Sequence, residues 1–276
     1  MNFLLLLISG FVSAFGFLLC KKASSDKFNP FSFALAFQFW NLVIAAPLML
    51  IGFGIPTDPL WWLVMFASAA LFTLSMALNF KTFETTDASV VSLIARLSII
   101  TASVLGIILT KEVINLQVFF ALILVILGTS TVCFEGKKFK ITRGIIAAFA
   151  YAIIYGIVAF IDKQAINHFS PFTYPFFNNL VTIILMSVVA KTRTEAIKIT
   201  LTKPVIILAG MLNLVSWATY LFALQNNDIS RAFPIWDSTI LLSVMILGFI
   251  FLSERKYLLQ KIIGTALTIG GVFLLG

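Results

Sequence analysis

Ten apolar runs divide the sequence, and they constrain its fold more than any other feature. Each run has roughly 17 to 25 residues, enough to cross the hydrocarbon core of a membrane as a helix. Short segments containing Pro, Gly, Asn or Asp separate the runs, and none could hold a soluble catalytic domain. The predicted spans are residues 2–20, 31–52, 60–80, 88–110, 115–134, 144–162, 172–190, 204–224, 230–252 and 258–275. We therefore expect an all-α integral membrane protein with ten transmembrane helices.

Composition and charge agree with this fold class. Apolar residues make up 61% of the chain and charged residues 11%, and the mean hydropathy is +1.07. Of the 19 Lys and Arg residues, 15 lie in or beside the loops after the odd-numbered spans, 3 lie beside the other loops, and Arg96 lies within a span. Because Lys and Arg stay on the cytoplasmic side, we predict an inner or plasma membrane protein with both termini outside the cytoplasm. Basic residues spread over helix ends indicate anchoring in the lipid bilayer rather than binding of nucleic acid.

The chain contains an internal repeat with a shift of about 141 residues. This shift aligns Asn29-Pro30 with Ser170-Pro171, Gln38 with Asn179, and Arg96 with Asp237. The halves are residues 1–136 and 141–276, with five predicted spans each. An odd number of spans obliges the second half to enter the membrane from the opposite face, so we expect two inverted five-helix repeats. Inverted repeats are the common plan of secondary transporters, with the substrate site near the midplane where the repeats meet.

Arg96 and Asp237 are charged residues inside apolar spans, at equivalent positions of the two repeats. A charge at membrane depth is costly and usually has a partner or a function. Two interpretations stay open. The residues form a buried ion pair, or they face a cavity in which Arg96 binds a carboxylate or phosphate and Asp237 binds an ammonium group or a coupling proton. Asp237 is the coupling candidate unless Arg96 holds it ionised.

Other polar and aromatic residues at similar depth are candidates for substrate binding. The amides are costly to bury without a partner, and the aromatic rings can contact a cation or a flat ligand. Each of them could instead bond or pack against a neighbouring helix. The candidates are Gln38, Asn178, Asn179, Tyr155, Trp217, Tyr220 and Trp236.

Several short motifs in the right order resemble the drug/metabolite transporter superfamily, in its ten-helix EamA-type branch. They include Ala232-Phe233-Pro234-Ile235-Trp236 in the ninth span, Ser253-Glu254-Arg255 before the tenth, and Lys111-Glu112 in the first repeat. The resemblance extends over nearly the whole chain and implies a secondary transporter of a small polar organic metabolite that works by alternating access. An amino acid or related zwitterion is favoured, because one cationic and one anionic group share the midplane.

Other functions were weighed against this one. Phe176-Phe177-Asn178-Asn179 is similar to an element of nucleotide-sugar transporters in the same superfamily, so an exchanger of nucleotide sugars or other phosphorylated metabolites is the alternative. A non-transporting scaffold or receptor is the alternative from a different class. The sequence contains no zinc-site spacing, P-loop or nucleophile elbow, which argues against an enzyme. We expect no catalytic residue, no metal and no cofactor.

Two further predictions concern helix ends and helix packing. Glu112 and its equivalent Glu254, each beside a basic residue at the end of a span, are expected to cap helices or stabilise interfaces. Small residues in the fifth and tenth spans are expected to pack these spans closely, with a homodimer interface as a second possibility. These small residues are Gly128 to Thr131, Gly264, Thr268, Gly270 and Gly271.

Overall fold

The computed structural model describes residues 2–23, 29–83, 91, 94–113, 115–133, 143–189, 193–252 and 258–275, and within them every regular element is a helix. The helices are α1 (Phe3–Ala23), α2 (Pro30–Met49), α3 (Pro59–Phe83), α5 (Leu97–Thr110), α6 (Leu116–Cys133), α7 (Arg143–Ala165), α8 (Tyr174–Val189), α9 (Arg193–Thr202), α10 (Val205–Gln225), α11 (Ile229–Leu252) and α12 (Leu258–Leu275). Within the described residues, α2, α3, α7, α10 and α11 are long and apolar enough to cross a membrane, and α1, α5, α6, α8 and α12 provide shorter apolar segments. The all-α membrane fold is as predicted.

The predicted spans match these helices closely, with two differences. In the span 88–110, residues 94 and 95 are helical, Arg96 forms a turn, and α5 starts at Leu97. The second difference is α9, which lies in the loop predicted between the apolar spans 172–190 and 204–224. Ala196 and Ile199 of α9 are buried and pack in one cluster with residues of α2. An apolar pair one turn apart is enough to hold a short surface helix, although it is too small to raise the local hydropathy.

Local chemistry fixes where several helices begin and end. The side chain of Asn29 accepts a hydrogen bond of 2.9 Å from Phe31 N, and Pro30 occupies the first helical position of α2. At the end of α5, Lys111 adopts a left-handed conformation with φ 55°, and Glu112 N donates to Gly106 O at 3.4 Å. This is the geometry of a Schellman-type helix end, and it turns Glu112 back towards the helix bundle.

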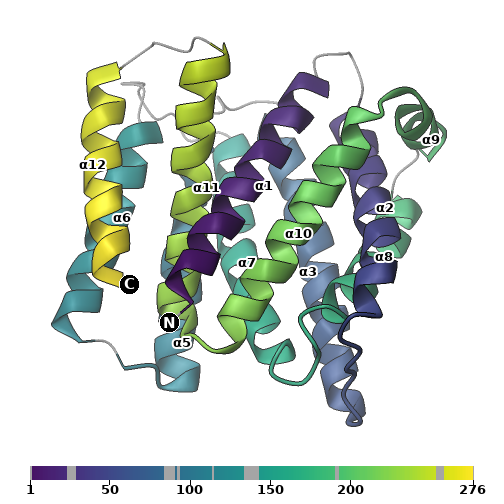
Figure 1. The fold of residues 1–276 in the computed structure, drawn as a ribbon, viewed down its shortest axis with the longest axis horizontal. Helices are drawn as coiled ribbons and strands as arrows, with labels where there is room; N and C mark the ends of the chain where they lie inside the picture. The colour runs from purple at the N-terminus through teal and green to yellow at the C-terminus, as the bar shows by residue number, and fades with distance from the viewer. Residues whose placement is uncertain are drawn as a thin grey trace.

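The first helix of each repeat packs against helices of the other repeat, in a pseudo-twofold arrangement. In the first repeat α1 packs on α10 and α11, and in the second repeat its equivalent α7 packs on α3 and α5, the equivalents of those helices. The pairs α6 and α12, α2 and α8, and α5 and α11 each join equivalent helices. Figure 1 shows that α1 and α7 run in opposite directions through the bundle, as inverted repeats require.

Contacts between loops divide the molecule into two faces. On the first, Ser170 N donates to Gly54 O at 2.9 Å, and the rings of Phe3 and Phe273 lie 6.0 Å apart near the two chain ends. We call this the terminal face. On the opposite face, which we call the α9 face, Ser32 Oγ donates to a carboxylate oxygen of Glu195 at 2.7 Å. The loops after even-numbered spans therefore share a face with both termini.

The small residues of α6 and α12 pack these two helices against each other within one chain. A Cβ atom added at Gly128 would clash with Thr268 Oγ1, and one added at Gly271 would lie 2.8 Å from Ala121 O. A Cβ at Gly270 would meet nothing within 4 Å. The predicted close packing of the two terminal spans is therefore confirmed for Gly128, Thr268 and Gly271, while Gly270 faces away from the contact.

Candidate functional site

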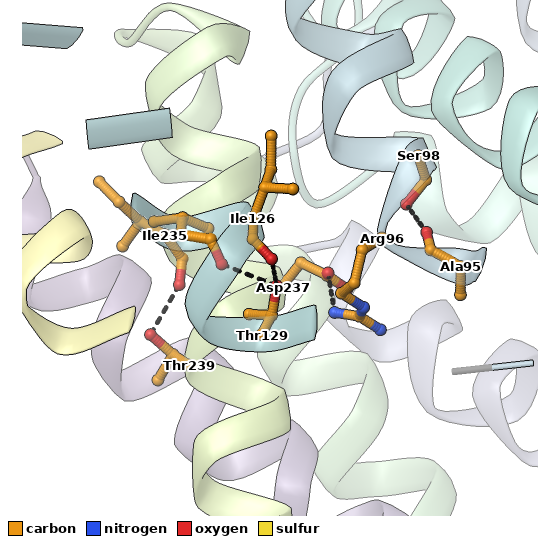
Figure 2. A network of polar contacts seen from close by, with 9 residues as sticks. Ala95, Arg96, Ser98, Ile126, Thr129, Ile235, Asp237 and Thr239 are labelled. Carbon is orange, nitrogen blue, oxygen red and sulfur yellow. Dashed lines mark hydrogen bonds and ion pairs between the residues drawn. The ribbon is translucent and has the colours of Figure 1, made fainter. Parts of the chain in front are cut away.

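Arg96 and Asp237 form an ion pair between the two repeats. Figure 2 shows the Arg96 side chain, beside the start of α5, directed at Asp237 of α11, and Arg96 Nη1 donates to Asp237 Oδ2. The two residues are 141 positions apart, which equals the repeat shift, and their side chains are only 13% and 14% exposed. Of the two interpretations left open by the sequence, the structure therefore contains the ion pair.

Local backbone features place these two charges opposite each other. Arg96 occupies the turn before α5, where Ile99 N donates to Arg96 O at 3.1 Å. Asp237 lies three residues after Pro234, which stands inside α11 and has no N–H to donate to the preceding turn. Arg96 therefore projects from an interruption of its span, whereas Asp237 projects from continuous helix in the turn that follows a proline.

Aromatic rings form one wall beside this pair. Tyr220 and Trp236 stack with centroids 4.3 Å apart, Phe233 packs against Trp236 at 6.3 Å, and Tyr155 lies 6.1 Å from Phe233. Tyr155 and Tyr220 are also within electrostatic range of Asp237. The structure thus brings Tyr155, Tyr220 and Trp236 together in one aromatic wall, in which Trp236 directly precedes Asp237 on α11.

Two polar atoms of this wall lack a hydrogen-bond partner among the described residues. They are Tyr220 Oη and Trp236 Nε1, and these residues are 3% and 8% exposed. Buried polar atoms usually have a partner in the protein, in water or in a ligand. The wall can therefore donate hydrogen bonds to a bound molecule.

A second polar network surrounds Asp162 of α7, a residue that the sequence analysis missed. Ser68 Oγ and Tyr174 Oη each donate to Asp162 Oδ1 at 2.5 Å, and Asn178 Nδ2 donates to Tyr174 Oη at 3.2 Å. Trp217 packs on Tyr174 with centroids 6.1 Å apart. The candidates Asn178 and Trp217 therefore belong to this network rather than to the Arg96–Asp237 pair.

The remaining amide candidates have other surroundings. Gln38 Oε1 accepts a 2.7 Å hydrogen bond from Asn41 Nδ2, which also lies 3.4 Å from Asn213 Oδ1, so this cluster joins α2 to α10. Asn179 is 3% exposed, and its Nδ2 has no partner within the described part of the chain. No contact in that part joins Gln38 or Asn179 to Arg96 or Asp237.

Glu112 joins the end of α5 to the start of α11 on the terminal face. Its two carboxylate oxygens accept hydrogen bonds of 2.9 Å from Ile229 N and 3.0 Å from Ser230 N, at the start of α11. These N–H groups have no partner inside the helix, so the carboxylate of Glu112, which follows the end of α5, caps the N-terminus of another helix. The predicted capping role is confirmed for Glu112, whereas Glu254 lies outside the described residues.

One cavity formed by the described residues does not extend to the Arg96–Asp237 pair. This cavity of about 200 Å³ lies between α1, α11 and α12, with walls that include Phe3, Leu7, Leu242 and Phe273. Its lining is mainly apolar and does not contain either charged residue.

Comparison with known proteins supplies the family and the fold. The model of the EamA-like transporter family matches the chain twice, over residues 1–134 and 142–276. A crystal structure of a protein with 14% sequence identity superposes with a TM-score of 0.77 and covers 98% of this chain and 94% of that chain. Identity this low indicates a shared fold only. No curated protein matches the sequence.

Proposed function

The chain belongs to the EamA-like transporter family, within the drug/metabolite transporter superfamily, and from this premise we propose that it moves an amino acid or related zwitterion by alternating access. The observation that carries the proposal is the Arg96–Asp237 pair, which joins equivalent positions of the two repeats in the middle of the bundle. In this proposal the substrate binds at the interface of the repeats, residues 1–136 and 141–276, in an inner or plasma membrane.

A zwitterion complements this pair in charge and geometry. Its carboxylate binds the planar guanidinium of Arg96 through two parallel hydrogen bonds, and its ammonium group binds the carboxylate of Asp237. One buried ion pair is thereby exchanged for two, so neither side chain is left unpaired. An unpaired buried charge would cost roughly 3–5 kcal/mol. A ligand with a single charge would leave one partner unpaired, and for this reason a zwitterion is favoured over a phosphorylated metabolite.

The aromatic wall provides a place for the rest of the substrate. Tyr220 and Trp236 present stacked rings and two buried polar atoms without partners, next to the residue that binds the ammonium group. A cation near an aromatic face gains roughly 0.5–2 kcal/mol, depending on desolvation. An amino acid with an apolar or aromatic side chain fits this wall better than a highly charged one.

The ion pair also explains how an empty site closes. Arg96 and Asp237 come from helices that belong to different repeats, so their contact favours a closed conformation when no substrate is bound. Substrate replaces the contact and allows the repeats to rock around the site, as inverted-repeat carriers do. Without a ligand, the pair prevents the bundle from opening to both faces at once.

The test is uptake into proteoliposomes that contain the purified protein. Labelled phenylalanine, leucine, serine, lysine and glutamate are offered, with a labelled nucleotide sugar for the alternative substrate class. Arg96→Gln and Asp237→Asn are compared with Arg193→Gln and Asp58→Asn, the same substitutions at exposed positions. We expect both site variants to lose at least about tenfold in uptake of a zwitterion, equal to about 1.4 kcal/mol, and the controls to match the wild type.

Competition by fragments of the substrate identifies the role of each charge. Phenethylamine lacks the carboxylate of phenylalanine, and 3-phenylpropionate lacks its ammonium group. Asp237→Asn should abolish inhibition by the amine, and Arg96→Gln should abolish inhibition by the acid. If both folded variants transport every substrate like the wild type, the proposed site is wrong. Uptake of the nucleotide sugar alone would favour the phosphorylated substrate class, and no uptake at all would favour a scaffold or receptor.

A further inference from the structure

Asp162 is a second buried carboxylate, and its hydrogen-bond partners among the described residues are hydroxyl groups, whereas that of Asp237 is Arg96. It is 6% exposed, and both of its hydrogen bonds come from the hydroxyl groups of Ser68 and Tyr174. Within the described part of the chain, no Lys, Arg or His forms an ion pair with it. An ionised carboxylate buried in this way is costly, whereas the neutral acid is not.

The groups that face Asp162 come from every side of its pocket. Ser68 lies on α3, Tyr174 and Asn178 lie on α8, and the rings of Tyr155 on α7 and Tyr220 on α10 are within its electrostatic range. Lys163 follows Asp162 in the chain, but its ammonium group is occupied elsewhere. It donates to Leu224 O at 2.7 Å and Gln225 O at 3.0 Å, at the end of α10. The environment of Asp162 is therefore polar and neutral.

The hydrogen-bond geometry leaves one carboxylate oxygen for a proton. Ser68 Oγ and Tyr174 Oη both donate to Oδ1, so neither hydroxyl occupies Oδ2. A carboxylic acid can accept two hydrogen bonds at its carbonyl oxygen while the other oxygen carries the hydrogen.

We propose that Asp162 binds and releases the coupling proton of the transport cycle, separately from the substrate charges at Arg96 and Asp237. This inference rests on the proposed function, which it deepens. Asp237 was the coupling candidate only as long as Arg96 did not hold it ionised, and the two residues are paired. Because Asp237 is paired with Arg96, Asp162 is the better candidate for proton binding among the described buried carboxylates.

Protonation of Asp162 would change the strength of a hydrogen bond between the two repeats. Ser68 belongs to the first repeat and Asp162 and Tyr174 to the second, so the Ser68–Asp162 bond crosses the α3–α7 interface. Hydrogen bonds to an ionised carboxylate are stronger than hydrogen bonds to the neutral acid. Loss of the proton thus tightens this interface, and its gain loosens it.

The first test measures proton binding directly and does not depend on transport. Infrared difference spectra of the purified protein between about pH 5.5 and alkaline pH, a range in which exposed Asp and Glu stay largely ionised, report the carbonyl stretch of a buried carboxyl group that loses its proton. We expect a band that titrates in the wild type, is absent in Asp162→Asn, and is retained in Asp58→Asn, the same change at an exposed position. Ser68→Ala and Tyr174→Phe, which each remove one donor, should shift the midpoint of this titration. A band that survives in Asp162→Asn would overturn the proposal.

The second test separates coupling from transport. Proteoliposomes with a pH gradient measure proton-driven accumulation of labelled phenylalanine, and liposomes preloaded with phenylalanine measure exchange, which needs no net proton movement. Asp162→Asn should lose accumulation at least about tenfold and keep exchange. Accumulation at the wild-type level would overturn the coupling proposal while the proposed function stands. If the wild type binds the proton at Asp162 but neither accumulates nor exchanges any substrate offered, proton binding is supported and the proposed function is wrong.

Discussion

At the scale of single residues, the Arg96–Asp237 pair has an energetic consequence that differs from that of an ordinary surface salt bridge. Both side chains are largely buried, so removal of one partner leaves an uncompensated charge in an apolar bundle. Removal of both partners leaves only two polar groups of similar size. The loss of one charge is therefore more damaging than the loss of both.

We predict that Arg96→Gln and Asp237→Asn each reduce the free energy of unfolding by about 3–5 kcal/mol, and that the double variant recovers most of this loss. Thermal unfolding of the purified protein in detergent, analysed as a double-mutant cycle, measures the coupling between the two residues. Arg193→Gln and Asp58→Asn should change stability by less than about 0.5 kcal/mol. Additive losses in the double variant would show that the ion pair does not contribute to stability.

The sequence predicted some of these residues and not others, for identifiable reasons. Arg96 and Asp237 were found because each interrupts an apolar span and the repeat shift superposes them. Asp162 was missed because it is the last residue of a predicted span, where a charge is ordinary. Its burial depends on Tyr174 and Ser68 from two other helices, and hydropathy along one segment contains no information about them.

At the scale of helices, the α6–α12 contact depends on glycines that leave no room for a side chain. A Cβ atom added at Gly271 would lie 2.8 Å from atoms of Ala121 and Val125, which is too close. A Cβ atom added at the adjacent Gly270 would meet nothing within 4 Å. These two neighbouring residues therefore provide a matched pair of positions on one helix.

We predict that Gly271→Ala lowers the stability of the protein and that Gly270→Ala does not. The added methyl at Gly271 would lie 2.8 Å from Ala121 O, a backbone atom that cannot rotate away, so the helices must separate. Overpacking of this kind costs about 1–3 kcal/mol. At Gly270, alanine should be neutral or stabilise α12 by up to about 1 kcal/mol, because it favours the helix more than glycine. Equal melting temperatures for the two variants in detergent would contradict the close packing of α6 and α12 at Gly271.

The cap that Glu112 provides to α11 gives a further prediction. Glu112→Ala leaves the N–H groups of Ile229 and Ser230 without acceptors, and loss of a cap typically costs about 0.5–2 kcal/mol. Val113→Ala, at a neighbouring side chain that is 77% exposed, is the control. Hydrogen exchange should show faster exchange of the first turn of α11 in Glu112→Ala only. Unchanged protection of that turn would indicate that the carboxylate is dispensable.

Apolar run length predicted where most helices begin and end, but it could not predict the interruption at Arg96 or the helix α9. The turn before α5 depends on the position of a charge opposite Asp237 in another repeat. The formation of α9 depends on Ala196 and Ile199 packing on α2, together with hydrogen bonds from Asn29 and Ser32 to Glu195. Both features come from contacts between distant segments, which outweigh local preference.

At the scale of the whole molecule, the inverted repeat was predictable, and the exchange of helices between the repeats was not. The repeat was visible because polar residues superpose at one shift. The sequence does not reveal that α1 packs on α10 and α11 of the other half, because surfaces that face lipid and surfaces that face protein are similarly apolar in a membrane. Small residues on opposing helices, such as Gly16 beside Ala209, decide these contacts.

The arrangement of the faces allows the orientation in the membrane to be tested. Thr57 lies on the terminal face and Thr194 on the α9 face, and both are exposed. Because Lys and Arg are concentrated beside the loops of the α9 face, we predict that this face is cytoplasmic. Cys20 and Cys133, the two cysteines of the chain, are replaced by alanine to provide a background for single cysteines.

A membrane-impermeant maleimide applied to intact cells should label Thr57→Cys and should label Thr194→Cys only after the membrane is permeabilised. Five predicted spans, 60–80, 88–110, 115–134, 144–162 and 172–190, separate Thr57 from Thr194. Because this number is odd, one orientation of the protein cannot expose both positions on the same side of the membrane. Labelling of Thr194→Cys alone in intact cells would reverse the orientation, place both termini in the cytoplasm and leave the inverted fold intact. Labelling of both positions in intact cells would contradict the division into two faces, and with it the odd number of spans in each repeat on which the inverted arrangement depends.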